Sequence, residues 1–455
     1  MKDGTQIRIR SLGNQGEGVG SHEGCALFVP GALPEELVQI EITEQHKKFG
    51  RAKLLSIDTP SPHRVRPICP LFGRCGGCQI MHLAYEQQLV YKRQKVVEAL
   101  RRIGKIEGAE ALTAPCLPSP SPLAYRNKIQ LPVRGSGDHL KIGLFARDSH
   151  NLIEVDHCFI HADLGELIYR ESKRLIKESG IDGYDPALKQ GELRHLLIKT
   201  SLKKQEALVL LVSHLPVSPL IRNLAKQIVA SLPAIKGVVY NYNPFHDNVI
   251  LGSHYELLAG QGEIEEELKG LRFRVSPASF FQVNPAQAEQ LYEKASAWAE
   301  LHEADLLVDA YCGVGTLALC LADKAKRVVG IECVPQAITD AKENARINGI
   351  SHANFLCGDA EKLLGRFKDV DILLLNPPRK GCSAKVLEES IQAKPKKILY
   401  ISCDPATLAR DLQILSLNGY KIEAVQPFDM FPQTAHVETL VLCTIPKYHD
   451  SKGSV

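Results

Sequence analysis

The sequence has no long apolar segment, no signal-like start and no strong net charge. No uninterrupted hydrophobic run approaches the roughly 18 to 20 residues that a membrane-spanning helix needs. The first ten residues, MKDGTQIRIR, have no apolar core behind their charges, which argues against a secretory signal. The formal net charge is only +3, which by itself predicts no partner. Together these absences predict a soluble, cytoplasmic protein.

What is present is an ordinary globular composition in a chain longer than one average domain. The 455 residues are 44% hydrophobic and 24% charged, as in folded proteins, and their number predicts two or three compact units. Between Lys47 and Lys105, thirteen Lys or Arg face three Asp or Glu, so this segment carries +10 and the remainder −7. Such a basic tract indicates a polyanionic partner, with a solvated helix face as the alternative.

Strand and helix patterns divide the chain into three parts. Short alternating strands in residues 1–58 predict a small β-barrel of the kind that binds oligonucleotides, with turns at its glycines. Residues 59–268 mix strands and helices, which indicates a central mixed α/β domain. In residues 269–455 apolar strands and helices alternate strictly. This alternation predicts a doubly wound, mostly parallel sheet whose ligands bind at the carboxyl ends of the strands.

Polar residues follow four successive strands of this C-terminal part. The segment LLVDAYCGVGTLAL places Asp309, Tyr311, Gly313 and Gly315 between a strand and a helix. This spacing departs from G-x-G-x-x-G, which weakens a dinucleotide interpretation. The next three strands end at Glu332, Asp359 and Asn376. Any one of these could be a turn or a helix cap, but four in succession predict a nucleoside-bearing cofactor, with S-adenosylmethionine favoured over NAD.

Two reactive side chains lie near later strand ends. Cys403 ends a buried strand just before a helix that begins near Pro405, where a thiol is expected to have a lowered pKa. Asp404 is a candidate N-cap whose charge opposes that effect. Glu438 begins the final strand in FDMFPQTAHVETL, so apolar neighbours are expected to raise its pKa and suit it to accept a proton. An inert buried cysteine and a salt-bridged glutamate are the alternatives.

A cysteine-rich loop indicates a metal centre in the central part. Cys69, Cys75 and Cys78 form a C-x5-C-x2-C pattern among glycines that allow a tight loop. Cys158 is the best candidate for a fourth ligand, and a histidine in that place would give a zinc site. The histidines considered are His63, His82 and His157. Spacing does not separate zinc from an iron–sulfur cluster, because both accept four thiolates.

The C-terminal motifs NPPRKG, ISCDPAT and FDMFPQTAHVE, in this order, resemble those of the RNA (uracil-5-)-methyltransferase family, and the likeness covers nearly the whole chain. Residues 1–57 are similar to a TRAM domain, an RNA-binding module of the ribosomal-RNA branch. The resemblance implies a Rossmann-like methyltransferase domain, Cys403 as nucleophile and Glu438 as general base. It implies that S-adenosylmethionine contacts Gln282, Tyr311, Glu332, Asp359 and Asn376. It also implies a [4Fe–4S] cluster on the four cysteines, with zinc as the alternative.

The expected reaction is therefore methylation of C5 of a uridine in 23S ribosomal RNA, through a covalent bond between Cys403 and C6. Transfer RNA is the alternative substrate, and a non-catalytic RNA-binding ribosome-assembly factor is the alternative function. An amino-methyltransferase that uses NPP is a third, but Arg379 stands where those enzymes usually have an aromatic. The family usually has Asp at Asn376 and Asn at Asp404; neither departure removes a reacting group. A monomer is the default oligomeric state.

Overall fold

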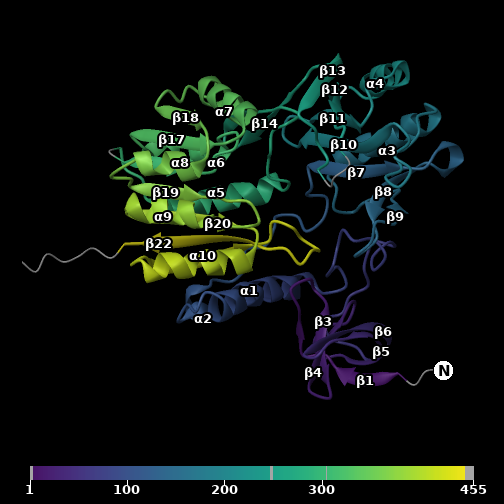
Figure 1. Cartoon of the computed structure of the whole chain (residues 1–455), viewed down its shortest axis with the longest axis horizontal. Helices are drawn as coiled ribbons and strands as arrows, with labels where there is room; N and C mark the ends of the chain where they lie inside the picture. The colour runs from purple at the N-terminus through teal and green to yellow at the C-terminus, as the bar shows by residue number, and fades with distance from the viewer. Residues whose placement is uncertain (1–3, 246–248, 304, 446–455) are drawn as a thin grey trace, which may run out of the picture. The chain divides into compact units, whose positions relative to one another are not determined.

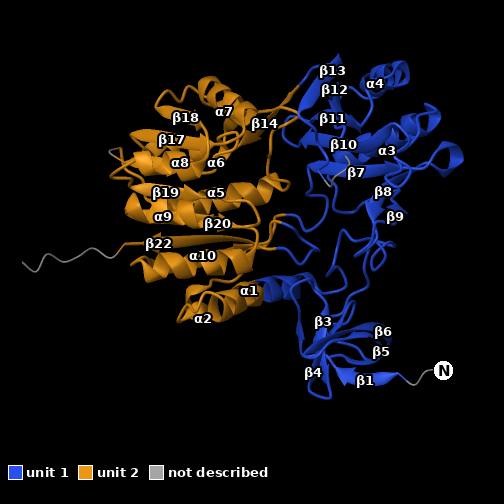
Figure 2. Ribbon diagram, in the orientation of Figure 1, with its two compact units in different colours: residues 1–92, 121–262, 431–436 blue, residues 93–120, 263–430, 437–455 orange. Residues whose placement is uncertain are grey.

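The computed structural model describes residues 4–245, 249–303 and 305–445, and Figure 1 labels its elements. The chain forms two compact units, neither continuous in sequence (Figure 2). Unit 1 comprises residues 1–92, 121–262 and 431–436; unit 2 comprises residues 93–120, 263–430 and 437–455. Unit 1 thus contains both the N-terminal part and most of the central part, and the three-part division stays a prediction.

The N-terminal part of unit 1 is a six-stranded sheet of order β1-β5-β6-β4-β3-β2. Its strands are β1 Thr5–Arg8, β2 Ser11–Leu12, β3 Gly18–His22, β4 Cys25–Val29, β5 Leu37–Gln45 and β6 Phe49–Thr59. The prediction of turns at Gly13, Gly16, Gly18, Gly20 and Gly24 was wrong for Gly18 and Gly20, which lie within β3. A Cβ at Gly18 would stand 2.8 Å from the Ala32 carbonyl oxygen, and one at Gly20 2.9 Å from that of Arg8. Glycine is used here because neighbouring backbone approaches closely.

The second sheet of unit 1 has seven strands in the order β13-β12-β11-β10-β7-β8-β9. Helices α3 and α4 pack against it, and their apolar residues share one core with the strands. This confirms the mixed α/β prediction. The elements are β7 Lys128–Arg134, β8 Lys141–Phe145, β9 Leu152–Glu154, α3 Asp163–Glu178, β10 Leu193–Ser201, β11 Glu206–Ser213, α4 Pro219–Ser231, β12 Ile235–Tyr242 and β13 His254–Gly260, with a 3-10 turn at Gly137–His139.

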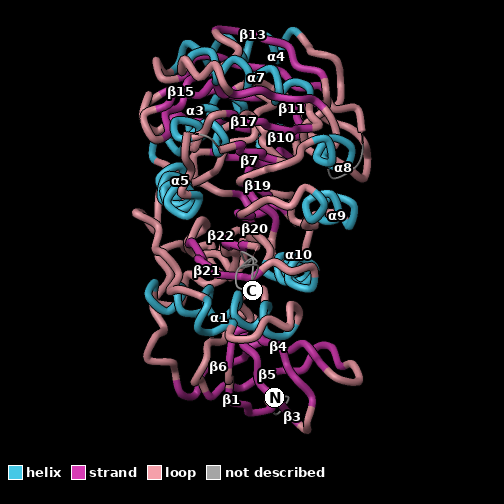
Figure 3. The backbone as a smooth tube through the Cα atoms, turned by 90° about the vertical axis from the view of Figure 1, so that its left-hand side faces the viewer, coloured by secondary structure: helices cyan, strands magenta, loops and turns pink. Residues whose placement is uncertain are grey.

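Unit 2 is built on a seven-stranded sheet of order β18-β17-β16-β19-β20-β22-β21. The first five strands are parallel, while β22 is antiparallel to both β20 and β21. Helix α5 covers one face and α9 and α10 the other (Figure 3), which confirms the doubly wound prediction. The strands are β16 Leu306–Asp309, β17 Arg327–Glu332, β18 Ala353–Cys357, β19 Ile372–Leu375, β20 Lys397–Ser402, β21 Lys421–Phe428 and β22 Glu438–Thr444.

The helices of unit 2 follow the strands closely. They are α5 Pro285–Ala299, α6 Thr316–Cys320, α7 Pro335–Ile347, α8 Ala360–Leu363, α9 Ala384–Gln392 and α10 Pro405–Leu417, with α2 Ala109–Leu112 and 3-10 turns at Ala322–Lys324 and Leu364–Arg366. A hairpin of β14 Ile264–Leu268 and β15 Leu271–Val275 precedes α5, and α1 Tyr85–Arg102 passes from unit 1 into unit 2. Within the described ranges, no helix is both long and apolar enough to cross a bilayer.

Candidate active site

One edge of the unit 2 sheet collects the residues that the sequence singled out. The parallel strands β16 to β20 all end there. Strands are added on one side of β16 up to β18 and on the other side from β19 onward, so the strand order reverses between β16 and β19, the point at which such sheets bind ligands. The predicted residues lie at the ends of these strands or in the loops that follow them: Asp309, Tyr311, Gly313, Gly315, Glu332, Asp359, Asn376 and Cys403. Gln282 lies ahead of α5 in the same unit. The structure therefore places these positions in one unit, and their roles remain predictions.

The glycine loop after β16 is held by the carboxylate that ends β17. Glu332 accepts hydrogen bonds from the backbone N–H groups of Gly313 (3.2 Å) and Val334 (2.9 Å). Gly315 has φ +85°, a conformation that favours glycine. Around Gly313, no described atom lies within 4 Å of where a Cβ would stand, so a ligand can approach the backbone there. Burial, followed by the negative charge of Glu332, raises the pKa of Asp309 to about 7.

Cys403 stands at the junction between β20 and α10. The side chain of Asp404 accepts hydrogen bonds from the backbone N–H groups of Ala406 (2.9 Å) and Thr407 (3.0 Å), which confirms it as the N-cap of α10. Cys403 itself is half-buried.

The expectation of a lowered thiol pKa was wrong for the protein without substrate. Burial raises the pKa of Cys403 to about 11, and the negative charges of Glu438 and Asp404 add to this. The positive charge of Arg379 acts in the opposite direction. Desolvation and two nearby carboxylates thus outweigh the helix N-terminus.

Glu438 reaches the same edge because β22 runs antiparallel to β20. In the register of these strands Ser402 pairs with Thr439, so the first residue of β22 lies beside the end of β20. The Glu438 side chain is buried, with 4% of the residue exposed. Burial raises the pKa of Glu438 to about 8 against the opposing charge of Arg379. The predicted rise in pKa is confirmed.

Arg379 acts on both reactive groups and was noted in the sequence only as a residue after NPP. Its guanidinium lowers the pKa of Cys403 and of Glu438. Its position in the loop after β19, next to the loop after β20, was the signal that could have identified it. Helix α10 fixes this loop, because Thr407 Oγ1 donates to the Arg379 carbonyl oxygen (3.1 Å) and Arg410 Nη2 to that of Lys380 (3.0 Å).

A buried carboxylate on the same helix secures the rest of that loop. Asp411 is 0% exposed and accepts from the Cys382 backbone N–H (2.8 Å) and the Tyr400 hydroxyl (2.6 Å). Asp411 therefore ties the loop after β19 to β20 and α10, the two elements that flank Cys403. Sequence reasoning missed this residue because its partners are brought together only by the fold.

The raised pKa of Glu438 predicts a pH-dependent cost to stability. Its pKa moves from an ordinary 4.5 to about 8, so the stability it contributes is complete below 4.5 and is lost as the pH rises through 8. Glu438→Gln removes this cost, and its Tm relative to wild type should rise between pH 5 and pH 9. A rise of the pKa from 4.5 to about 8 is worth up to roughly 5 kcal/mol. Since about 1 kcal/mol moves Tm by roughly 2–4 °C in domains of 150–250 residues, the difference should reach on the order of 10 °C. A Tm difference independent of pH would contradict the raised pKa.

The four cysteines of the predicted metal centre all lie in unit 1. Cys69, Cys75 and Cys78 occupy the loop before α1, and Cys158 follows β9. Burial raises the pKa of Cys78, and the thiols of Cys158, Cys75 and Cys69 raise it further. Three of these cysteines pack on one apolar cluster; they are Cys69, Cys78 and Cys158. The four sulfur atoms are therefore near neighbours, with Cys158 the strongest influence on Cys78 among the other three.

Among the described residues, no group of three or more His, Cys, Asp or Glu side chains is arranged to hold a metal ion. Of the alternative histidine ligands, His157 faces a carboxylate instead, with its Nδ1 3.2 Å from Glu166. His82 lines the pocket described below, whose walls also include Cys69.

Comparison with known proteins agrees with this architecture. Residues 84–445 match the family model described as tRNA (Uracil-5-)-methyltransferase, and residues 5–55 match the TRAM domain. An uncharacterized RNA methyltransferase of Clostridium acetobutylicum is 42% identical over 441 residues, 96% of each chain. One of Halalkalibacterium halodurans is 39% identical over 97% of this chain and 96% of its own.

A solved structure resembles nearly the whole chain. The tRNA (uracil-54, C5)-methyltransferase of Pyrococcus abyssi, in complex with S-adenosyl-L-homocysteine, matches with a TM-score of 0.78 and 28% identity, over 97% of this chain and 100% of its own. The ribosomal-RNA branch and the iron–sulfur motif stay predictions. The chain belongs to the tRNA (uracil-5-)-methyltransferase family, with an N-terminal TRAM domain, and is an RNA methyltransferase that uses S-adenosylmethionine.

Proposed function

We propose that this protein methylates C5 of a uridine in 23S ribosomal RNA, with Cys403 as the nucleophile and Glu438 as the general base. The observation that supports this chemistry is the meeting of a thiol, a buried carboxylate and a guanidinium at one sheet edge. Glu438 raises the pKa of Cys403, and Arg379 lowers the pKa of both. Such mutual influence requires that the three groups lie close together.

The residues of the chain account for the two difficult parts of the reaction. Carbon 5 of uracil is a poor nucleophile; addition of the Cys403 thiolate to C6 moves the ring electrons onto O4 and makes C5 reactive. After methylation, Glu438 removes the proton from C5, the C5–C6 double bond re-forms and the bond between sulfur and C6 breaks. The positive charge of Arg379 stabilises the Cys403 thiolate and the Glu438 carboxylate.

The loops after β16 to β19 suit a bound S-adenosylmethionine, which supplies the methyl group. The open backbone at Gly313 permits close approach, and the carboxylate of Glu332 ends β17 where ribose hydroxyls are bound in related folds. Tyr311, Gly315, Asp359 and Asn376 complete the proposed set along this edge, and Gln282 joins it from the segment before α5.

We also propose that Cys69, Cys75, Cys78 and Cys158 hold a [4Fe–4S] cluster with a structural role. The proposal is supported by the donor set: the thiols of Cys158, Cys75 and Cys69 raise the pKa of Cys78, and the thiol of Cys75 raises the pKa of Cys158. When bound, the cluster would offset the repulsion between the four thiolates. It would also hold together the cysteine loop, which lies within the basic tract from Lys47 to Lys105. Zinc is the alternative metal for the same donors.

A Cys75→Ala variant tests the cluster. Chemical analysis of the anaerobically purified wild type should find iron and sulfide in equal amounts, and the variant should lose most of both. If the cluster stabilises a surface that binds RNA, the affinity of the variant for RNA should also fall. Zinc without sulfide in the wild type, or unchanged RNA binding by a folded variant, would contradict the respective part of the proposal.

Transfer RNA is a second candidate substrate, favoured by a specific observation. The Pyrococcus abyssi enzyme whose structure matches 97% of this chain acts on uracil 54 of tRNA according to its description, and the matched family is described for tRNA. The 23S proposal rests instead on the resemblance of the TRAM-like and cysteine segments to the ribosomal-RNA branch.

One experiment separates these candidates. The protein is incubated with tritiated S-adenosylmethionine and unmodified transcripts of either 23S ribosomal RNA or tRNA, and the labelled nucleoside is identified after digestion. 5-Methyluridine from the 23S transcript alone supports the proposal, and from the tRNA alone supports the second candidate. Label on an exocyclic amine, or tight RNA binding without any label, would refute uracil-C5 methylation by this chain.

A further inference from the structure

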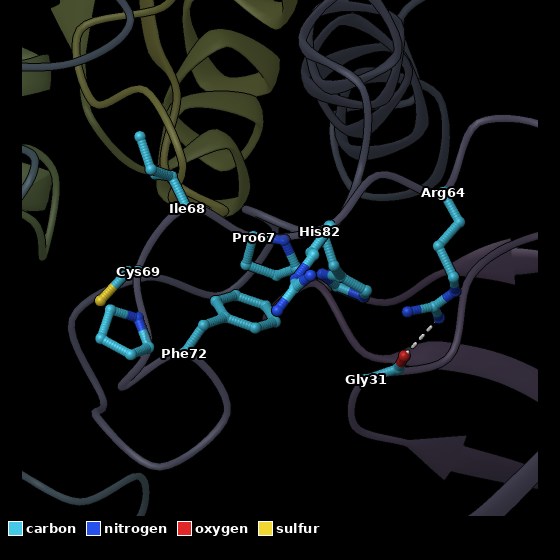
Figure 4. Close-up of a pocket in the computed structure, with 9 residues that line it drawn as sticks. Gly31, Arg64, Pro67, Ile68, Cys69, Phe72 and His82 are labelled. Atoms are coloured by element: carbon cyan, nitrogen blue, oxygen red, sulfur yellow. Dashed lines mark hydrogen bonds between the residues drawn. The ribbon is translucent and has the colours of Figure 1, made fainter.

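Unit 1 contains an open pocket that the reaction above does not use. Its volume is about 790 Å³, within the range of ligand pockets, roughly 300–1,000 Å³. It lies between the turn after β4 and the loop that leads into the cysteines, and its walls include Gly31, Arg64, Phe72 and His82 (Figure 4). The sulfur of Cys69 points away from the rings of Phe72 and His82 in this view.

One wall of the pocket is fixed by a buried ion pair. Arg64 donates from Nε and Nη2 to the two carboxylate oxygens of Glu36, at 2.5 and 2.8 Å, and from Nη2 to the Gly31 carbonyl oxygen at 2.7 Å. Glu36 is 0% exposed. The charge of Arg64 is therefore already neutralised, and this residue joins the N-terminal sheet to the loop instead of offering a free cation.

The pocket also contains a buried side chain with unmet hydrogen-bonding capacity. His82 is 1% exposed, and neither ring nitrogen has a partner among the described residues. Its ring lies 5.0 Å from that of Phe72, at 39°. An unpaired buried polar group is costly, which calls for an explanation. Burial lowers the pKa of His82 to about 4, so the neutral ring presents one donor and one acceptor.

The rim of the pocket has the composition of a single-stranded RNA contact. Arg66 is exposed, and no described residue pairs with it. Ile68, beside it in the lining, is 54% exposed. A free guanidinium beside apolar and aromatic surface fits a phosphate followed by an unstacked base. The surrounding segment from Lys47 to Lys105 carries +10.

We propose that this pocket binds one unstacked nucleotide of the RNA substrate, other than the uridine that reacts at Cys403. The base lies against Phe72 and Ile68 with its edge toward His82, and its phosphate is held by Arg66. This subsite rests on the proposed function only in that RNA is the substrate. It adds affinity and selects the sequence or loop around the target uridine.

The test uses the full-length protein and two variants with different expectations. Arg66→Gln removes an exposed cation, and His82→Leu replaces the unpaired ring with an apolar side chain that should leave Tm unchanged or higher. The matched control is Arg170→Gln, an exposed arginine on α3 of the same unit. The probes are fluorescently labelled, unmodified transcripts of 23S ribosomal RNA and of tRNA, with affinity measured at several salt concentrations.

We expect Arg66→Gln and His82→Leu each to weaken binding of the unmodified transcript that serves as the wild-type substrate by roughly tenfold, with kcat at saturating RNA unchanged. The salt slope should fall by about one for Arg66→Gln only. Binding within twofold of wild type by either folded variant, or an equal loss in Arg170→Gln, overturns the proposal. If the His82→Leu variant does not fold, the RNA affinity of the Arg66→Gln variant, whose substitution is exposed, decides the test. Failure of the proposed function is a separate result, in which the wild type methylates neither transcript. In that case the affinities of the two variants and the wild type for the 23S transcript decide whether the pocket binds RNA.

Discussion

A Cys403→Ala variant is expected to transfer no methyl group to RNA while binding S-adenosylmethionine within a few-fold of wild type. Without the thiol no bond to C6 forms, and C5 remains a poor nucleophile. Loss of a covalent nucleophile costs roughly 10⁴-fold or more in turnover. Cys403 is half-buried at the head of α10, and the cap by Asp404 does not use its side chain, so the fold should persist.

The measurement is tritium transfer to the transcript that the wild type methylates, alongside equilibrium binding of S-adenosylmethionine. Cys25→Ala serves as the control, because this half-buried cysteine lies on β4, in the N-terminal sheet of unit 1. Residual turnover by Cys403→Ala above a hundredth of wild type would rule out position 403 as the nucleophile.

A Glu438→Gln variant should instead accumulate a covalent complex with RNA. Addition of the thiolate and methylation both precede removal of the C5 proton, so loss of the base stops the reaction at the adduct. The substitution also removes the negative charge that raises the pKa of Cys403, which should speed adduct formation at a given pH. The complex should appear as a protein band of reduced mobility on a denaturing gel and disappear after ribonuclease treatment.

In the wild type, turnover should rise with pH through an apparent pKa near 8. Glu438 accepts a proton only as the carboxylate, and burial raises its pKa to about 8, so most molecules hold an inactive base at neutral pH. The thiol, with its pKa near 11, adds a further rise in the same direction. Glu423→Gln, which removes a half-buried carboxylate paired with Lys421 on β21, should keep the wild-type profile. Turnover that falls between pH 6 and 8, or no adduct in Glu438→Gln, would exclude Glu438 as the base.

Much of the fold of unit 2 could be predicted because each strand is a short apolar run that ends in polar residues. The alternation of strands and helices predicted for residues 269–455 is present from β16 to β20, and the antiparallel end of the sheet agrees with a mostly parallel prediction. The N-terminal sheet was harder to predict from the sequence, since glycines such as Gly18 and Gly20 are typical of turns. Their place in β3 follows from the close approach of Ala32 and Arg8, which lie elsewhere along the chain.

Some features of the candidate site could likewise be predicted from the sequence, and others are determined only by the fold. The chemical identities of Cys403 and Glu438, and their positions at strand ends, are local properties that the order of residues already contains. Their proximity depends on the antiparallel register of β22 against β20, which joins residues 35 positions apart. The role of Asp411 and the double influence of Arg379 depend on loops packed against α10.

Residue order was thus sufficient for the alternation of strands and helices, for the strand-end polar groups and for the kinship with uracil methyltransferases. Packing in three dimensions decided the ionisation of the reacting thiol, the discontinuous make-up of both units and the presence of an unpaired histidine in a pocket beside the cysteine loop. The reason is physical: patterns along the chain report which atoms are bonded in succession. Ionisation and hydrogen-bond satisfaction instead depend on desolvation and on charges supplied by residues distant along the chain.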